Sequence, residues 1–265
     1  MEDLKDQFLR TGFVKLPSFF DDEEIDCWAK DLGWLVEVQL ARSGGQKCGK
    51  RSPVGRLSQN LIALNKLSTE AQGWIYDEVN RRPWIHRLAG DNRLIDLAQL
   101  VLESKHIGIH PRLNMVMAMP GRDWHLADWH QDAFYGPHNH LVMYVPLQAT
   151  GAHNGGLCVA KGEHKKGLFE HNLGNNSVES KWLSLNPDYL TAESTLQLEL
   201  GAGDLLLFDG YLPHSATRNT SKDVRFALTI RYTNLEDDYF INRGWRWQDL
   251  AASGLAALQS SNADD

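Results

Sequence analysis

The second half of the sequence, from about residue 106, consists of short apolar or alternating runs, and this pattern constrains the fold more than any other feature. Glycine, proline, asparagine and aspartate clusters separate the runs, as they commonly separate strands in sandwiches and barrels. The runs are HPRLNMVMAMP, HLVMYVPLQ, GGLCVA, STLQLEL, DLLLFDG and RFALTIRYT. We therefore expect a sandwich or small barrel of antiparallel strands between about residues 106 and 235.

The first 105 residues carry helical patterns instead. Asp21 is followed three residues later by Glu24, which is the spacing of a capping box, and apolar residues then recur at helical intervals from Ile25 to Val36. Further helical patterns occur in STEAQGWIYDEVN and NRLIDLAQLVLES. The predicted class is α+β, with N-terminal helices packed against a barrel of antiparallel strands.

The chain contains no internal repeat, low-complexity tract or interdomain linker of recognisable composition. We therefore expect one domain over residues 1–265. Its helical part is predicted over about 1–105, the barrel over about 106–235 and a C-terminal extension over 236–265.

Charge and cysteine content narrow the range of partners. The formal net charge is -7 and the sequence pI is near 5.9, so the basic surface that binds nucleic acid or anionic membranes is not expected. Cys27, Cys48 and Cys158 are too few and too scattered for a disulfide framework. The N-terminus lacks a signal-peptide pattern, and no apolar run approaches the roughly 20 residues that span a bilayer. These features predict a soluble cytoplasmic protein, and they do not predict its oligomeric state.

A histidine and an aspartate stand two residues apart in WHQD, in a stretch that we expect to be a strand. His130 and Asp132 would then share a face, roughly 6.5 Å apart along the backbone. With a second imidazole they would form the facial triad typical of non-haem Fe(II), which leaves three coordination positions free. Because a single His-x-Asp is common, the third ligand decides the matter. His214 is the candidate, because it follows a predicted apolar strand and would emerge at its rim.

The last apolar run, VRFALTIRY, alternates strictly. One face carries Val224, Phe226, Leu228 and Ile230, and the other carries Arg225, Ala227, Thr229 and Arg231. Two interpretations fit this pattern. The arginine face lies in water, as is usual for a half-buried antiparallel sheet, or it lines the barrel, where an arginine fork would bind a carboxylate.

Five ordered blocks of the sequence resemble the phytanoyl-CoA dioxygenase family of iron(II)- and 2-oxoglutarate-dependent oxygenases. The resemblance runs from about residue 7 to residue 245. The blocks are FLRTGFVKLPSFFDDEEI, WHQD, NGGLCVAKGEHKKG, GAGDLLLFDGYLPHSATRN and VRFALTIRY. It implies a double-stranded β-helix, or jelly-roll barrel, with Fe(II) as the metal and 2-oxoglutarate and O2 as co-substrates.

Matching positions carry the family's site residues onto this chain. The resemblance implies that His130, Asp132 and His214 bind iron and that Arg225 grips the distal carboxylate of 2-oxoglutarate. The implied activity is hydroxylation of an unactivated C–H bond, with release of succinate and CO2. Asp132, where a halogenase would have a small residue, favours hydroxylation over halogenation.

Other positions are implied to approach the co-substrate. Tyr144 stands where some members have a tryptophan that lines the pocket, and a methionine row includes one position near the co-substrate, although such rows are usually core. The positions are Gln131, Tyr144, Ser215, Thr217 and Met117. His164 in KGEH matches a histidine of a glycine-containing loop, where we expect a structural hydrogen bond.

Two other classes of protein compete with the oxygenase. The first is a non-catalytic binding or sensing module, for metal or 2-oxoglutarate, that kept the barrel and lost turnover; a module that has lost its chemistry need not keep an intact ligand set and Arg225. A zinc hydrolase is able to use two imidazoles and a carboxylate, but it has no use for Arg225.

Substrate choice is less constrained. Two basic, glycine-containing segments, 41–56 and 238–247, either are solvated surface or border the mouth of the site, and His138 and His140 are further candidates to face it. Their cations are Arg42, Lys47, Lys50, Arg51, Arg56, Arg243 and Arg246. If they form lids, the substrate is expected to be a small polar or anionic metabolite or a natural-product intermediate.

Overall fold

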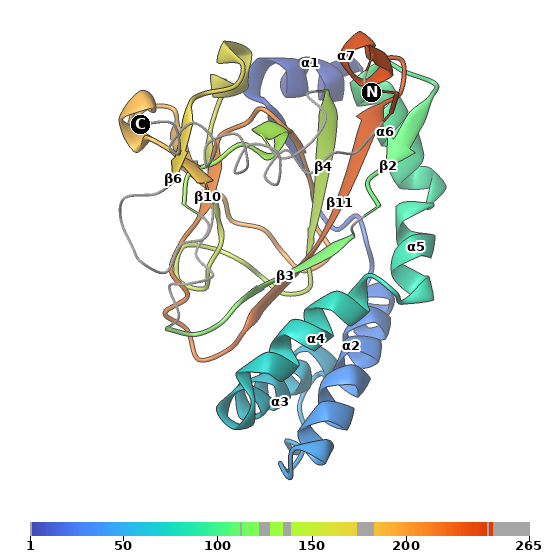
Figure 1. Cartoon of the computed structure of the whole chain (residues 1–265), viewed down its shortest axis with the longest axis vertical. Coiled ribbons are helices and arrows are strands. Elements are labelled where there is room, and N and C mark those ends of the chain that lie inside the picture. The colour runs from blue at the N-terminus through green and yellow to red at the C-terminus, as the bar shows by residue number, and fades with distance from the viewer. Residues whose placement is uncertain are drawn as a thin grey trace, which may run out of the picture.

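A computed structural model describes residues 2–111, 113–121, 128–134, 139–173, 183–242 and 244–245. Helices dominate the first hundred residues and strands the remainder (Figure 1). The helices are α1 (Glu2–Thr11), α2 (Asp22–Arg42), α3 (Pro53–Leu67), α4 (Thr69–Val79), α5 (Pro83–Ala89), α6 (Asn92–Leu102) and α7 (Asp238–Asn242), with 3-10 turns η1 (Asp132–Phe134), η2 (Glu163–Lys166) and η3 (Pro187–Tyr189). The strands are β1 (Phe13–Leu16), β2 (Ile107–Ile109), β3 (Asn114–Ala118), β4 (His140–Pro146), β5 (Leu157–Ala160), β6 (His171–Leu173), β7 (Leu183–Leu185), β8 (Thr195–Gln197), β9 (Leu205–Asp209), β10 (His214–Ala216) and β11 (Arg225–Asn234).

The strands form two main antiparallel sheets. The larger has the order β1-β9-β4-β11-β2, and β3 pairs with the first half of β11. The smaller has the order β10-β5-β8, and β6 and β7 form a separate hairpin-like pair. These facing sheets make the antiparallel double-stranded β-helix, and the predicted α+β class is confirmed.

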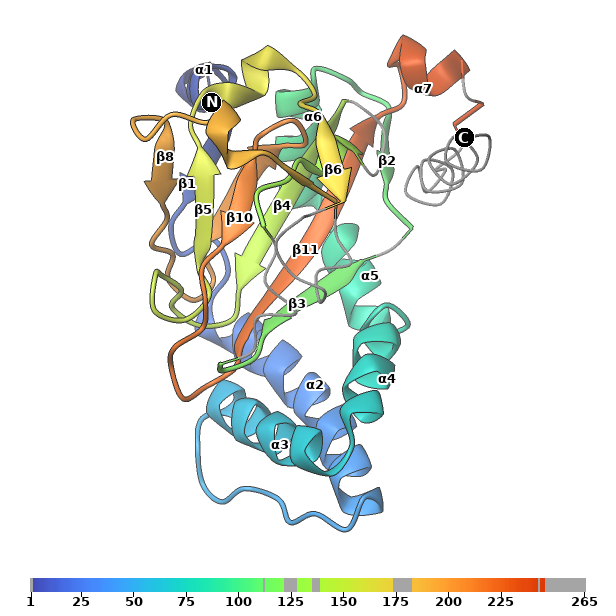
Figure 2. The same cartoon turned by 60° about the vertical axis from the view of Figure 1, so that its left-hand side comes forward.

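Two apolar clusters occupy the two faces of the larger sheet. The interior cluster lies between the sheets and includes Val142 and Tyr144 of β4, Phe208 of β9 and Val159 of β5. The outer cluster lies between the larger sheet and helices α2 to α6, which cover that face along one side and one end (Figures 1 and 2). Both faces of β11 are therefore buried.

This burial decides between the two interpretations of the alternating run. Phe226, Leu228 and Ile230 pack in the outer cluster against the helices. Arg225 and Ala227, on the opposite face, are buried between the sheets. The arginine face is the lining of the barrel and not a solvated surface.

The helix signals in the sequence are confirmed where they were strongest. Asp21 caps α2 and forms a complete capping box with Glu24, and Asp91 caps α6. The N-terminal part is not wholly helical, however. Residues Phe13–Leu16 form β1, which pairs with β9 at the edge of the larger sheet. Four residues are too few for a strand to be distinguished by alternation alone.

In the described portion of the chain, every helix is too short or too polar to cross a membrane.

Candidate metal centre

The three predicted ligands meet at one end of the barrel interior. The backbones of His130 and His214 form an isolated β-bridge, with N–H···O distances of 3.0 and 2.9 Å in the two directions. Asp132 follows as the first residue of η1. The stretch around WHQD is therefore a bridge followed by a 3-10 turn and not the continuous strand expected from the sequence.

His214 also differs from expectation in its local structure. The apolar strand β9 ends at Asp209, and a turn separates it from β10, which begins at His214. His214 pairs with Val159 in β10–β5, and Val159 belongs to the interior cluster. Because directly paired residues share a face, the ring of His214 lies inside the barrel.

The ligand atoms have the spacing of a metal site. The atoms that His130, Asp132 and His214 offer all lie within 4.8 Å of one another, and His130 Nε2 is 3.8 Å from Asp132 Oδ1. Each imidazole uses Nδ1 to donate to a backbone carbonyl, His130 to Asp128 at 2.7 Å and His214 to Leu212 at 3.0 Å. These bonds place the lone pair on Nε2 of both rings, which is the donor that a metal requires.

The carboxylate of Asp132 is held in its charged form. Burial alone raises its pKa, but the guanidinium of Arg231 and the neighbouring imidazoles oppose this effect and hold the pKa well below its usual range. Arg231 donates a hydrogen bond from Nε to Asp132 Oδ2 at 2.9 Å, and its Nη2 forms an ion pair with the same oxygen at 2.8 Å. The sequence placed Arg231 on the same face as Arg225, but no signal connected it to Asp132.

Burial has the opposite effect on His214. Removal from water, with a smaller contribution from His130, lowers the pKa of His214 to about 3. A proton therefore does not compete with a metal for this imidazole near neutral pH. Protonation of His214 should therefore weaken metal binding only well below pH 6.5, the ordinary pKa of a histidine.

The metal-free protein is expected to lose stability as the pH falls from about 6.5 to about 3. In this window the unfolded chain protonates His214 while the folded chain does not, so the unfolded state binds more protons. The expected slope from this group is roughly 1 kcal/mol per pH unit, measured by urea unfolding across the window. His214→Phe should flatten this part of the curve, and an unchanged slope in that variant would contradict the assignment.

A buried guanidinium lies in the same interior. Arg225 is 2% exposed and donates from Nη2 to the carbonyl of Gly155, while its Nε and Nη1 have no hydrogen-bond partner among the described residues. The hydroxyl of Tyr144 is also buried without a partner there. Tyr144 lies opposite Thr229 on the interior face, and although burial raises its pKa, Arg225 acts in the opposite direction, as expected of a close cation.

The backbone approaches Arg225 closely at Gly155. Gly155 has φ +85°, and a Cβ there would lie 2.8 Å from Ala118 Cβ and 3.5 Å from Arg225 Nη2. Only glycine fits this conformation and this close approach without strain. Nε and Nη1 of Arg225 and the hydroxyl of Tyr144, three buried donors that have no partner in the described part of the chain, suit a carboxylate guest because isolated buried polar groups are otherwise unfavourable. The two imidazoles and one carboxylate likewise suit Fe(II).

Comparison with known proteins settles the family. The sequence profile described as Phytanoyl-CoA dioxygenase (PhyH) matches residues 8–227. The chain belongs to the phytanoyl-CoA dioxygenase family. It is a family of iron(II)- and 2-oxoglutarate-dependent oxygenases, so His130, Asp132 and His214 are its facial triad.

The relatives with curated functions include several small-molecule oxygenases. The chain is 33% identical over 121 residues to the 2-aminoethylphosphonate dioxygenase of Uncultured bacterium HF130_AEPn_1, covering 42% of this chain and 43% of that protein. It is 34% identical over 143 residues to the 1-deoxypentalenic acid 11-beta-hydroxylase of Streptomyces arenae, covering 51% and 50%. These matches thus span about half the length of each relative. The ectoine dioxygenase of Sphingopyxis alaskensis is 28% identical over 272 residues, covering 95% and 83%.

Solved structures share the fold. The apo form of the non-heme monooxygenase ThoJ has a TM-score of 0.61 at 18% identity, covering 88% of this chain and 78% of ThoJ. The epimerase SnoN, in complex with Fe3+, alpha ketoglutarate and nogalamycin RO, has a TM-score of 0.57 at 17% identity, covering 88% and 83%. At these identities the likeness concerns the double-stranded β-helix alone.

Within this member of the phytanoyl-CoA dioxygenase family, the predicted role of Gln131 needs correction. Its side chain is 0% exposed and its amide is fully engaged. Nε2 donates to the carbonyls of Gly167 at 2.8 Å and Tyr211 at 2.6 Å, and Oε1 accepts from the Phe169 N–H at 2.7 Å. These three hydrogen bonds anchor Gln131, which lies between the ligands His130 and Asp132 in the sequence, to the backbone of two other segments. Its amide therefore has no free group for the co-substrate.

The structure also moves Met117 away from the co-substrate. Met117 pairs directly with Phe226, and both belong to the outer cluster under the helices. Arg225 immediately precedes Phe226 in β11 and faces the barrel interior. Phe226 and its partner Met117 therefore lie on the other side of the sheet. The alternating methionines are core residues, as such a row usually is.

The two hydroxyls after the distal histidine lie in different places. Ser215 pairs with Cys158 on the face opposite His214 and is not brought together with Arg225. Thr217 Oγ1 donates to the Gly156 carbonyl at 3.3 Å, beside the glycine that contacts Arg225. Of the two, only Thr217 remains a candidate for the co-substrate pocket. His164 makes the expected structural bond, to the Leu9 carbonyl at 3.2 Å.

The basic segment 41–56 does not border the site. It connects α2 to α3 at the end of the molecule away from β10 (Figure 2), and two of its cations, Lys47 and Arg56, pair with Glu37 of α2 at 2.8 and 3.6 Å. This placement supports the solvated-surface interpretation. His140 is buried close enough to Asp132 to lower its pKa, so it belongs to the interior and not to an exposed rim.

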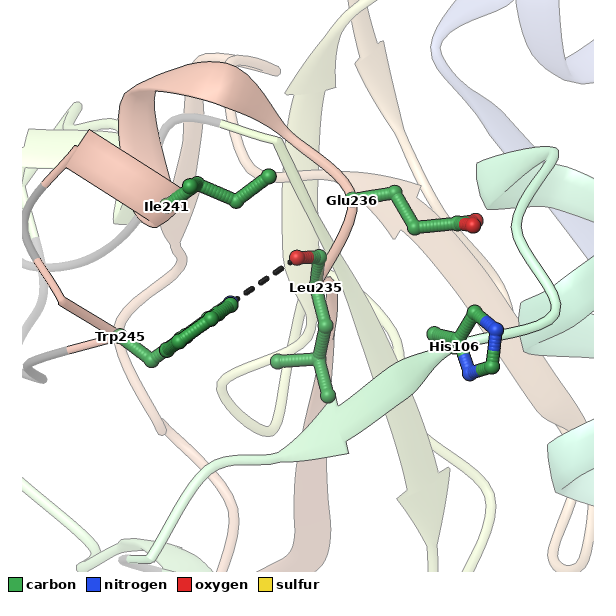
Figure 3. Close-up of a pocket in the computed structure, with 5 residues that line it drawn as sticks. All are labelled: His106, Leu235, Glu236, Ile241 and Trp245. Carbon is green, nitrogen blue, oxygen red and sulfur yellow. Dashed lines mark hydrogen bonds between the residues drawn. The ribbon is translucent and has the colours of Figure 1, made fainter.

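The second segment, 238–247, falls partly outside the described residues, as do His138, Arg243 and Arg246. Its described part, α7 with Trp245, helps to line a surface pocket of about 480 Å³ next to β2 (Figure 3). Trp245 Nε1 donates to the Leu235 carbonyl at 3.0 Å, and the other lining residues are His106, Glu236 and Ile241. None of the triad residues lines this pocket.

Proposed function

We propose that this chain is an iron(II)- and 2-oxoglutarate-dependent hydroxylase that acts on a C–H bond of a small polar metabolite or natural-product intermediate. The observation that carries the proposal is the pair formed by Arg225 and Tyr144 in the same barrel interior as the triad. Their buried donors without described partners match the distal carboxylate of a co-substrate that chelates the metal at its other end.

Each side chain has a distinct role in this proposal. His130, Asp132 and His214 would hold the metal, and a facial triad would leave it free to bind the keto-acid end of 2-oxoglutarate and O2. When bound, iron and 2-oxoglutarate together supply the oxidising chemistry, with succinate and CO2 as products. Arg225 pairs with the distal carboxylate through its planar fork, and the hydroxyl of Tyr144 donates beside it.

The barrel lining favours these interactions. Around Tyr144, the interior cluster consists of apolar side chains such as Val142, Leu206, Phe208 and Ala227. In this water-poor surrounding an arginine–carboxylate pair is stronger than at a surface, and the pair compensates for the burial of Arg225. The same lining excludes bulk water from the reacting centre.

The alternative functions account for less of the geometry. A zinc hydrolase would use the three ligands, but it would leave the buried cation of Arg225 without a purpose. A binding module that has lost turnover need not keep both the complete ligand set and Arg225. The presence of Asp132 as third ligand favours hydroxylation over halogenation.

The substrate class rests on the relatives and on the correction to segment 41–56. The 2-aminoethylphosphonate, ectoine and 1-deoxypentalenic acid enzymes are all described as acting on small molecules. Because segment 41–56 is remote from the triad, it provides no basic lid that would select an anionic substrate. We therefore propose a small molecule and leave its charge open.

The proposal is tested with purified protein, Fe(II), 2-oxoglutarate and O2. The candidate panel consists of aminophosphonates, cyclic amino acids of the ectoine type and terpenoid carboxylic acids. A true substrate should release one succinate for each product heavier by one oxygen atom, and Arg225→Met protein should give neither. Turnover with Zn(II) and without 2-oxoglutarate would instead establish a hydrolase.

A further inference from the structure

Arg231 contacts the carboxylate ligand in an asymmetric way. Its Nε and Nη2 both approach Asp132 Oδ2, at 2.9 and 2.8 Å, while Oδ1 lies 3.8 Å from His130 Nε2 on the metal side. Within the described ranges, Arg231 is the only lysine or arginine that forms an ion pair with a triad residue. The two oxygens of Asp132 are therefore in different environments.

From this geometry we propose that Arg231 is a positioning residue, which restricts Asp132 to metal coordination through Oδ1 alone. This inference rests on the proposed function, because it concerns the positions left for the co-substrates. Arg231 does not touch the reacting atoms in this account and acts only through Asp132.

The backbone of Asp132 alone does not orient its side chain. Asp132 starts the three-residue turn η1, in which the Ala133 N–H donates to the carbonyl of Gly210, just after β9, at 2.8 Å. Rotation about the side-chain bonds would still exchange or share its two oxygens. A second partner is needed to fix which oxygen faces the metal.

Arg231 is well placed to be that partner, because it stands on a rigid element. It lies in the middle of the β11–β4 ladder, directly opposite Val142. Its side chain is 21% exposed, so the ion pair is largely shielded from water. A guanidinium held in this way imposes its planar geometry on a more loosely held carboxylate.

The consequence concerns coordination number. Aspartate is able to bind a metal through one oxygen or through both. In a facial triad three positions must remain, two for a chelating keto acid and one for O2. If Asp132 bound through both oxygens, one of these positions would be lost. By engaging Oδ2, Arg231 preserves the third position.

The test uses Co(II), which is redox-stable and has absorption bands that report coordination number. Arg231→Gln removes both the positive charge and the planar guanidinium group. Arg231→Lys keeps the positive charge but replaces the guanidinium by an ammonium. Arg81→Gln is the matched control, because Arg81 is an arginine on an exposed turn, with its side chain 74% exposed. Co(II) affinity and spectrum are measured first without, then with, 2-oxoglutarate, and circular dichroism verifies the fold of each variant.

Both Arg231 variants should bind Co(II) about 10- to 100-fold more weakly or with an altered band intensity, as is typical when a partner of a metal ligand is lost. They should also bind 2-oxoglutarate more weakly, while Arg81→Gln matches the unaltered protein. If Arg231→Lys keeps the original Co(II) affinity and spectrum, Arg231 acts only through its charge and the inference is overturned.

These outcomes are separable from failure of the proposed function. If the unaltered protein binds Co(II) but never 2-oxoglutarate, the hydroxylase proposal fails. The comparison of Co(II) spectra without 2-oxoglutarate would still decide whether Arg231 fixes Asp132. Should Arg231→Gln fail to fold, the Lys variant alone decides, because it retains a cation beside Asp132.

Discussion

Replacing Arg225 by methionine is expected to weaken 2-oxoglutarate binding strongly while metal binding remains. The guanidinium is the only described cation buried next to Tyr144, and its Nε and Nη1 have no described partner without a guest. Loss of one partner of a buried, hydrogen-bonded charge pair costs about 3 kcal/mol, or roughly 100-fold in Kd. Isothermal titration of Co(II)-loaded protein with 2-oxoglutarate measures this change.

The same substitution has an unusual expected effect on stability. Most substitutions of buried residues are destabilising, but Arg225 is a buried cation whose hydrogen-bond partner among the described residues is the Gly155 carbonyl alone. Methionine of similar length should leave the free energy of unfolding of the ligand-free protein unchanged or raise it. Arg225→Lys should also lose most 2-oxoglutarate affinity, because an ammonium lacks the fork. Full 2-oxoglutarate affinity in either variant would mean that the co-substrate lies elsewhere.

Asp132→Ala is expected to have the second large effect, on metal binding and on stability together. The substitution removes a ligand, so Co(II) affinity should fall by at least about 100-fold. It also leaves Arg231 as a largely buried cation without a partner, which should lower the free energy of unfolding by about 3 kcal/mol. Metal titration and urea unfolding measure the two effects.

A double variant separates these effects. Asp132→Ala combined with Arg231→Met should recover most of the lost stability, because no unpaired charge remains, but it should not recover metal binding. Asp188→Ala, an exposed carboxylate on η3, is the control for removal of an aspartate. Wild-type metal affinity in Asp132→Ala would show that the ligand set is wrong.

The fold and the ligands were predictable from the sequence for a definite reason. Residues that must share a face or a cap follow short-range rules: Asp21 caps α2, and VRFALTIRY alternates over β11. Family spacing then identified His130, Asp132 and His214 without any knowledge of their backbone. The backbone expected around them, a strand through His130 and Asp132, was wrong, yet the bridge and turn bring the same atoms together.

What the sequence could not predict depends on contacts between distant segments. The alternation of VRFALTIRY is compatible with Arg225 either in water or inside the barrel. Only the smaller sheet, which covers that face of β11, places it inside. Gln131 is engaged by carbonyls near residues 167 and 211, so its apparent role changes once these segments are in place. The pair between Arg231 and Asp132 joins positions 99 residues apart, and no local pattern encodes it.

The central claim is that the triad and Arg225 together bind one metal-chelating co-substrate. Anaerobic addition of Fe(II) and 2-oxoglutarate to the purified protein tests it most directly, by the weak visible charge-transfer band of the keto-acid chelate. The band should appear in the unaltered protein, disappear in Asp132→Ala, and require far more 2-oxoglutarate in Arg225→Met. A protein that binds Fe(II) at the triad but shows no such band at saturating 2-oxoglutarate would contradict the account.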